Sequence, residues 1–235
     1  NQIGNGVFSA LLGGTLMKRT QDNQTIDANN YSSDLFLDNI GAAGSYSIFV
    51  SNIDYRYLSG FLRLNYNWND KYLFNASVRR DGSSRFGPNN QYGNFAALGA
   101  AWIFSEEQFI KNEISWWSFG KIRGSYGTTG NDQIGDYGYL DAYEVTRGPS
   151  GLYPTQLFNP DYSWETNKKL ELALELGFIK DRINVAISWY RNRSSNQLVG
   201  LSLPAMTGFT SVQANLPATV ENRGWEIEWN TRNIA

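Results

Sequence analysis

Apolar and polar residues alternate with a period of two through much of this 235-residue chain, in segments of about 10 to 14 residues. Residues 57–68 place large apolar side chains on one face, and residues 71–80 repeat the pattern. Only Asn69 and Asp70 separate the two segments, which is the length of a tight hairpin connection. The alternation therefore predicts paired antiparallel strands, each with one apolar and one polar face.

A second hairpin is predicted from residues 169–178 and 183–189, which Lys180 and Asp181 join. Residues 7–18, 92–104, 116–127 and 220–231 show the same alternation less regularly. Together these segments predict an all-β, antiparallel chain of about eight strands. The apolar row of the second hairpin is predicted to face lipid and consists of Leu170, Leu172, Leu174 and Leu176.

The predicted connections alternate in length along the chain. Two are tight turns, and residues 105–115 form a moderate connection with a helical turn predicted at residues 106–110. Long connections rich in Gly, Asn, Ser, Asp and Tyr are predicted at residues 20–56, 81–91, 128–163 and 195–219. The six prolines, which cannot donate to a strand ladder, all fall between the predicted strands. Short turns at one end and long loops at the other are typical of outer-membrane β-barrels.

Composition excludes several classes of chemistry. The chain has no Cys and no His, which excludes disulfide frameworks, cysteine nucleophiles, Ser-His-Asp triads and imidazole-ligated metals. Lys and Arg number 20 against 22 Asp and Glu, so charge gives no reason to expect nucleic acid. The longest uncharged run of small and apolar residues, 96–104, is shorter than the ~20 residues of a spanning helix. Membrane strands with one apolar and one polar face are compatible with a mean hydropathy of -0.43.

Aromatic residues make up 15 % of the chain and gather beside the short turns. In a membrane barrel, such positions would form an interfacial girdle. In a soluble β-sandwich, they would instead be core or turn-packing residues. The girdle candidates are Tyr66, Trp68, Tyr72, Trp102 and Trp116.

Several motifs occur in an order that is specific to one family. Residues 72–87 read YLFNASVRRDGSSRFG and are followed by Gly93-Asn94-Phe95 and Ala101-Trp102. This run resembles the barrel signature of SusC/RagA-type TonB-dependent outer-membrane transporters. Four later stretches fit the same signature in order: residues 123–131, residues 159–166, the hairpin through Asp181-Arg182, and residues 221–226.

The resemblance implies an antiparallel transmembrane β-barrel of roughly 22 strands, of which about eight lie in this chain. Residues 1–235 would be a segment of one β-barrel domain, with the plug domain, the TonB box and the signal peptide not in this chain. It implies the outer membrane of a Gram-negative bacterium and import of a large solute, a glycan or a peptide. The partners would be a SusD-like surface lipoprotein, TonB acting on the plug, and outer-membrane lipid, with no cofactor.

Two alternatives compete with this interpretation. An independent eight-stranded barrel is compatible with the number of predicted strands. A soluble β-sandwich-type carbohydrate-binding module, using Trp and Tyr to hold sugar, is compatible with the aromatic content.

The charged segment 79–85 and the small-residue strand 95–101 are candidates for contact with a plug. Three arginines and one aspartate lie close together in the first segment, although a solvated turn at Asp81-Gly82 is the more common reason for such a cluster. Small residues on the inner face of the second segment would allow close backbone approach. The candidate plug-facing residues are Arg79, Arg85, Phe95, Ala97 and Gly99.

Aromatic residues of the long loops could stack on sugar rings or peptide side chains, or pack on one another. These candidates are Tyr137, Tyr139, Tyr143, Tyr153, Phe158, Tyr162 and Phe209. The carboxylate pairs Glu226/Glu228 and Glu171/Glu175 raise the question of a glycosidase, but each lies opposite an apolar face and is interpreted as lumen lining. Asp132, Asp136 and Asp141 lack the ligand spacing of a calcium loop. We therefore expect neither catalytic nor metal-binding residues.

Overall fold

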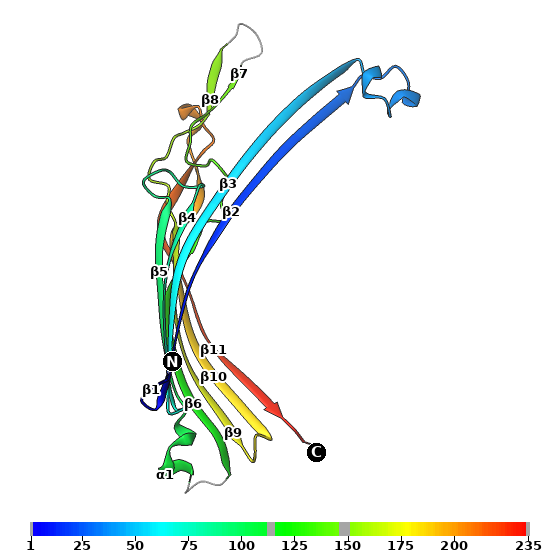
Figure 1. The fold of residues 1–235 in the computed structure, drawn as a ribbon. Coiled ribbons are helices and arrows are strands. Elements are labelled where there is room, and N and C mark those ends of the chain that lie inside the picture. Colours follow the sequence, from blue (N-terminus) through cyan, green and yellow to red (C-terminus); the bar gives the residue numbers. More distant parts are fainter. Residues whose placement is uncertain (1, 112–115, 146–150, 234–235) are drawn as a thin grey trace.

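The computed structural model describes residues 2–111, 116–145 and 151–233. Its main element is one curved antiparallel sheet of nine strands in the order β1-β2-β3-β4-β5-β6-β9-β10-β11 (Figure 1). The strands are β1 (Gln2–Ile3), β2 (Gly6–Asn29), β3 (Ser45–Trp68), β4 (Tyr72–Ser83), β5 (Tyr92–Trp102), β6 (Trp117–Asn131), β9 (Glu165–Phe178), β10 (Ile183–Ser202) and β11 (Ser211–Thr231). The predicted all-β class and all eight predicted strands are confirmed.

The remaining elements are short. A separate two-stranded sheet pairs β7 (Ala142–Val145) with β8 (Leu152–Gln156). The helical elements are η1 (Asp34–Phe36), η2 (Ile40–Ala42), η3 (Phe104–Glu106), α1 (Gln108–Lys111) and η4 (Ala205–Thr207). Across the described ranges, no helix combines the length and apolar character needed to cross a membrane. Because the only other sheet in the described part of the chain is this small hairpin, the β-sandwich alternative is wrong.

Strand register gives the main sheet two chemically distinct faces. Leu174 lies directly opposite Ile122 on β6 and Ile187 on β10, and Ile187 lies opposite Ile227 on β11. Directly opposed residues share a face, so these residues form one row of what we call the apolar face. The alternate positions, including Glu175 beside Lys121, form the polar face.

The ends of the sheet differ as predicted. Asn69 and Asp70 turn the chain between β3 and β4 with φ of 53° and 54°, and three residues with positive φ, Ile179 to Asp181, connect β9 to β10. Asn and Asp tolerate this left-handed conformation better than most residues. These turns, together with η3 and α1, lie at one end, whereas the longer connections and β7–β8 lie at the other (Figure 1). The predicted helical turn at residues 106–110 is confirmed by η3 and α1.

The prediction of a loop over residues 20–56 was wrong. β2 and β3 pair continuously from Gly6 opposite Trp68 to Asn29 opposite Ser45, so only residues 30–44 connect them. The part of this hairpin beyond β4, residues 18–56, projects from the sheet, and we call it the arm (Figure 1). Its strands lack regular apolar alternation, but a backbone ladder does not need any side-chain pattern to form.

Two other long connections also contain strand. β10 runs to Ser202 and β11 begins at Ser211, with an irregularity beside Asn196, whose φ is 60°. Pro217 therefore lies inside β11, and Pro154 lies inside β8. For these two prolines, the prediction of a position between strands was wrong. Both sites tolerate a missing N–H, because Pro217 lies at the irregularity in pairing and β8 has a free edge within its small sheet.

Candidate functional site

The polar face carries paired charges where β6 and β9 lie side by side. Arg123 contacts Glu171 at 2.7 Å and Glu175 at 2.8 Å, and Lys121 contacts Glu175 at 3.2 Å. Farther along the same face lies a polar cavity of about 510 Å³. Its polar lining residues are Ser125, Lys169, Glu171, Ser188, Tyr190, Asn192, Asn222 and Glu226. Glu171 and Glu175 are each paired with a cation, which is consistent with their interpretation as lining.

At the turn end, aromatic rings form an unbroken chain of contacts across neighbouring strands. Ring centroids lie 5.5 Å apart for Trp68–Tyr72, 6.4 Å for Tyr72–Trp102 and 5.6 Å for Trp116–Phe178. Phe104 and Trp117 complete the chain, and Phe104 packs on Trp102 at 5.8 Å. Tyr66 lies two residues before Trp68 on β3, opposite Phe74. The structure thus brings four of the five girdle candidates into one band of rings and places the fifth beside it.

Glu107 ties the polar atoms of this band together. Its carboxylate accepts hydrogen bonds from the Tyr72 hydroxyl at 2.8 Å, Lys71 Nζ at 3.0 Å and Trp102 Nε1 at 3.2 Å. These donors, the Tyr72 hydroxyl foremost, hold the pKa of Glu107 below its ordinary value of 4.5. The segment between β5 and β6 is thereby anchored to the rings that it covers.

Acid should release this anchor. Because the folded-state pKa of Glu107 is depressed, its contribution to stability is present above pH 4.5 and is lost as the pH falls through the folded-state pKa. We expect Glu107→Gln to lower the urea midpoint of unfolding at neutral pH, and the difference from wild type to vanish in acid. Glu106→Gln, which removes an exposed pair with Lys111, is the matched control and should change the midpoint less. A difference that stays constant with pH would contradict this role.

At the loop end, four buried aromatic residues form a small core. Phe86 is 0 % and Tyr162 1 % exposed, and Trp164 and Phe95 are also buried. Phe86 lies 5.0 Å from Trp164 and 6.0 Å from Tyr162 between ring centroids, and Trp164 lies 5.7 Å from Phe95. The indole N–H of Trp164 donates to the Gln91 carbonyl at 3.1 Å. This loop core joins the connection after β4 to the connection before β9.

Arg85 forms a polar latch beside the loop core. Its Nε donates to Asp136 at 2.9 Å, its Nη1 donates to the Asp132 carbonyl at 2.9 Å, and its guanidinium lies 4.3 Å from the centre of the Tyr55 ring. Asp132 also accepts from the hydroxyls of Tyr55 and Ser83, each at 2.8 Å. Burial, and then the hydrogen bond to Asp132, raise the pKa of Tyr55 to about 12. Tyr55 therefore keeps its hydroxyl proton at neutral pH, and the contacts of Arg85 and Asp132 hold the loop after β6 against β3 and β4.

The other plug-facing candidates lie on the polar face. Arg79 donates to Asp81 and to the Tyr57 hydroxyl, both at 2.5 Å. Phe95 is buried against Trp164 and covers Gly130 so closely that a Cβ there would collide with its ring. Ala97 and Gly99 follow Phe95 on the same face of β5. Arg85 and Phe95 are thus engaged by this chain's own loops, whereas Arg79 keeps 43 % of its side chain exposed.

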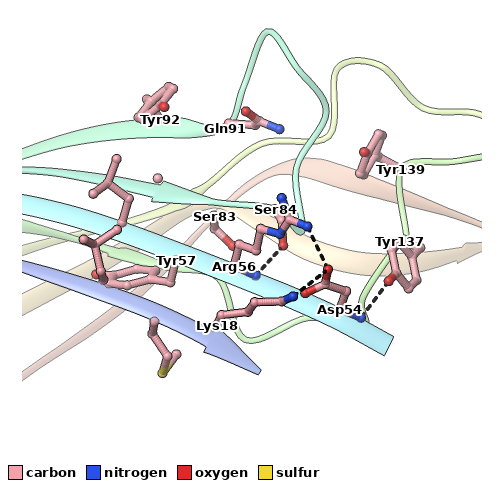
Figure 2. A pocket seen from close by; sticks show the side chains of 14 residues that line it. Lys18, Asp54, Arg56, Tyr57, Ser83, Ser84, Gln91, Tyr92, Tyr137 and Tyr139 are labelled. Atoms are coloured by element: carbon pink, nitrogen blue, oxygen red, sulfur yellow. Dashed lines mark hydrogen bonds and ion pairs between the residues drawn. The ribbon is translucent and has the colours of Figure 1, made fainter. Parts of the chain in front are cut away.

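A notch opens where β4 ends at Ser83 while β2 and β3 continue as the arm (Figure 2). It is a cavity of about 830 Å³ bounded by the arm and by loop residues such as Tyr137 and Tyr139. Asp54 pairs with Arg56 at 2.9 Å and Lys18 at 3.8 Å, and its backbone N–H donates to the Tyr137 hydroxyl at 2.7 Å. Figure 2 shows these charged groups on one side of the notch, with Tyr139 and Tyr92 on others. Aromatic faces combined with charged and hydroxyl groups suit a polar ligand that contains rings.

The loop aromatics divide into exposed and packed residues. Tyr143 (56 %) and Phe158 (55 %) are the most exposed, followed by Tyr153 (44 %) and Tyr137 (38 %). Tyr139 packs against the loop core and also lines the notch, and Phe209 is half-buried. Tyr162 is inside the loop core, so for this residue the structure favours packing over ligand contact. Sequence reasoning missed the arm and the notch, because their strands carry no regular alternation.

Comparison with known proteins places these features in a family. The model of the family described as TonB dependent receptor-like, beta-barrel matches residues 3–233. "TonB-dependent receptor P39" of Formosa agariphila is 39 % identical over 170 residues, which are 71 % of this chain and 16 % of that protein. "TonB-dependent receptor SusC" of Bacteroides thetaiotaomicron is 34 % identical over 187 residues, which are 75 % of this chain and 18 % of SusC. This chain therefore spans less than a fifth of either relative.

Among solved structures, that of the RagAB peptide transporter superimposes with a TM-score of 0.85 at 28 % identity. The match covers 96 % of this chain and 25 % of that one. These relatives are named receptors or transporters rather than enzymes.

Proposed function

Because this chain belongs to the family of TonB dependent receptor-like β-barrels, we propose that it forms part of the wall of an outer-membrane barrel that imports a large solute. The solute is a glycan or a peptide, and a SusD-like surface lipoprotein acts with the barrel. The outer membrane of a Gram-negative bacterium is the site of action, as it is for the family.

The observation that carries this proposal is the division of one sheet into an apolar and a polar face. Leu172 is 51 %, Ile122 49 % and Leu98 64 % exposed on the apolar face, and exposing such a surface to water would be costly. Lipid would cover it, and the ring band at the turn end would lie at the membrane interface. The polar face, with its ion pairs and cavity, would line an aqueous lumen.

The lumen would hold a plug on which TonB acts, and neither the plug nor the TonB box is assigned to this chain. The candidates for plug contact are Arg79 and the small residues Ala97 and Gly99, all on the polar face. The Arg79 side chain is 43 % exposed. Arg85 would act indirectly, by fixing the loops above the lumen.

The arm is proposed as the surface on which the lipoprotein rests. Its apolar side chains are exposed, with Leu35 at 89 %, Val50 at 66 % and Leu37 at 57 %. They lie at the loop end, which is the extracellular end in this family. An exposed apolar patch beyond the membrane is typical of a surface that binds another protein.

The exposed loop aromatics and the notch are proposed to make the first contacts with solute. Tyr143, Tyr153 and Phe158 are exposed at the surface of the loops, and exposed aromatic rings stack on sugar rings and peptide side chains alike. RagAB is described as a peptide transporter, and this similarity favours a peptide as the solute here.

Co-purification from the native outer membrane tests the partner and the barrel together. We expect the full-length protein to need detergent, to be several times larger than 26.5 kDa, and to bring a lipoprotein with it. Leu35→Glu with Leu37→Glu at the arm tip should reduce the recovered lipoprotein at least about tenfold. Asp34→Ala with Asp38→Ala in the same segment is the matched control and should not.

Full recovery of lipoprotein with the Leu35 and Leu37 variant would contradict the arm as its docking surface. A wild-type protein that stays soluble without detergent would contradict the membrane barrel itself. Uptake of labelled peptides and labelled glycans by the same cells would identify the solute class.

A further inference from the structure

On the apolar face, a compact group of basic side chains lies beyond the apolar rows, toward the loop end of the sheet. Trp189 on β10 lies opposite Leu172 and Trp225, and the next outward residue, Arg191, lies opposite Leu170 and Arg223. One step farther toward the loops, Arg193 lies opposite Lys168 and Glu221. We call Lys168, Arg191, Arg193, Arg223 and Glu221 the basic patch. It has four cations and one anion, in a chain whose net charge is -2.

Glu221 organises the patch without covering it. Its carboxylate contacts Arg193 at 2.5 Å, Arg191 at 3.4 Å and Arg223 at 3.9 Å. The side chains of Arg193, Arg191 and Arg223 remain 47 %, 36 % and 72 % exposed to solvent, and Lys168 is also exposed. Three positive charges in excess therefore face outward from three adjacent strands.

The change from apolar to charged residues follows an oblique line across the sheet. On β3 the apolar row that begins at the turn end stops at Leu58, and the next residue toward the loops on this face is Arg56. On β4 the row stops at Val78, and the next residue is Arg80, which lies opposite Gly60 of β3. On β9 and β10 the first charged residue on this face lies still closer to the turn end: Lys168 follows Leu170 on β9, and Arg191 follows Trp189 on β10. Strands of a barrel tilt by about 35–45° from its axis, so a line of constant height crosses their registers obliquely. These cations thus mark one level around the barrel, the outer edge of the apolar band.

From this placement we propose that the basic patch binds the phosphate of a lipid headgroup in the outer leaflet. The inference rests on the proposed membrane barrel. Guanidinium groups form bidentate hydrogen bonds to phosphate oxygens, and Trp189 and Trp225 lie where the acyl chains of the same lipid would begin. Because the patch lies on the face opposite to the polar cavity, it is not on the path of an imported solute.

Lipid retention by the full-length transporter tests the proposal. The protein is reconstituted in phosphatidylcholine nanodiscs that contain a small fraction of phosphatidic acid, and the bound phosphatidic acid is counted by native mass spectrometry. Each basic side chain near an anionic lipid surface contributes roughly a fivefold factor in binding. We therefore expect Arg191→Gln with Arg223→Gln to weaken retention about thirtyfold, and Arg191→Lys with Arg223→Lys to keep most of it.

Lys168 and Lys169 provide a matched pair on opposite faces of β9. Lys168→Gln should weaken retention about fivefold, whereas Lys169→Gln, which faces the polar cavity, should leave it unchanged. This pair tests the proposal even if the arginine double variant fails to assemble, since Lys168 is exposed and its removal leaves the three ion pairs of Glu221 in place.

Equal retention by wild type and Lys168→Gln, or equal loss in Lys168→Gln and Lys169→Gln, would overturn the proposal. Displacement of the lipid by inorganic phosphate at the same concentration would also overturn it, because the site would then recognise free phosphate. Failure of the wild type to enter the nanodisc would count against the membrane barrel instead. Normal assembly together with absent lipid retention would count against the patch alone.

Discussion

Replacing Phe86 by alanine should unfold the loop end of the molecule while leaving the sheet in place. Phe86 is fully buried and contacts two of the other three rings of the loop core. Removal of a buried Phe side chain costs about 3 to 5 kcal/mol. The loop core has four buried residues, so a loss of this size is large compared with the stabilisation that so small a core can supply.

Hydrogen exchange resolved by segment would measure this effect. We expect residues 84–91 and 157–164 to lose protection in Phe86→Ala, and the amides shared by β9 and β10 to keep theirs, because their pairing does not involve Phe86. Phe158→Ala is the control, since that ring is an aromatic of the same loops but is 55 % exposed. Equal protection of the loops in Phe86→Ala and wild type would show that the loop core does not hold them.

Loss of the loop core should also impair capture of solute more than assembly of the barrel. The core and the Arg85 latch set the positions of Tyr137 and Tyr139, which border the notch. Loops that are already ordered bind a ligand more tightly, because disordered loops lose conformational entropy when the ligand binds.

Leu174→Arg should strongly reduce assembly of the barrel in lipid. Leu174 is at the centre of the apolar row from Leu170 to Phe178 and lies between Ile122 and Ile187. An arginine at the midplane of the lipid face of a β-barrel costs about 2 to 4 kcal/mol. The fraction of heat-modifiable, folded barrel and its urea midpoint in lipid vesicles would report the loss.

Ser188→Arg is the matched control for this substitution. Ser188 is on the neighbouring strand but lines the polar cavity, as do Glu171 and Glu226. A new arginine there would lie near two carboxylates in a polar environment. We expect its assembly to be close to wild type. If Leu174→Arg and Ser188→Arg assembled equally well, the assignment of the two faces would be wrong.

Alternation alone was sufficient to predict the strands that lie within the apolar band. Each of these strands must present one face to an apolar medium and one to a polar medium, so its residues alternate and the register follows. The short turns were equally readable, because Asn69-Asp70 and Lys180-Asp181 supply residues that adopt positive φ. The order of motifs then indicated the family, and the family match confirmed it.

Beyond the apolar band, no such requirement acts on the side chains, and the pattern in the sequence no longer predicts strands there. The arm and the ends of β10 and β11 are held by backbone ladders, which leave no pattern in the sequence. The same limit affected the candidate site, where the loop aromatics could be identified but not divided into packed and exposed residues.

The amino-acid sequence by itself thus determined the strand faces, the turns and the aromatic band, because each depends on residues close together in the chain or on a repeating contact with one medium. Only the tertiary structure decided that Tyr162 and Phe95 are buried, that Arg85 joins Asp132 and Asp136, and that the basic side chains of three strands share one patch. Those arrangements bring together residues far apart in sequence, and their geometry follows from the register and tilt of the strands rather than from any local pattern.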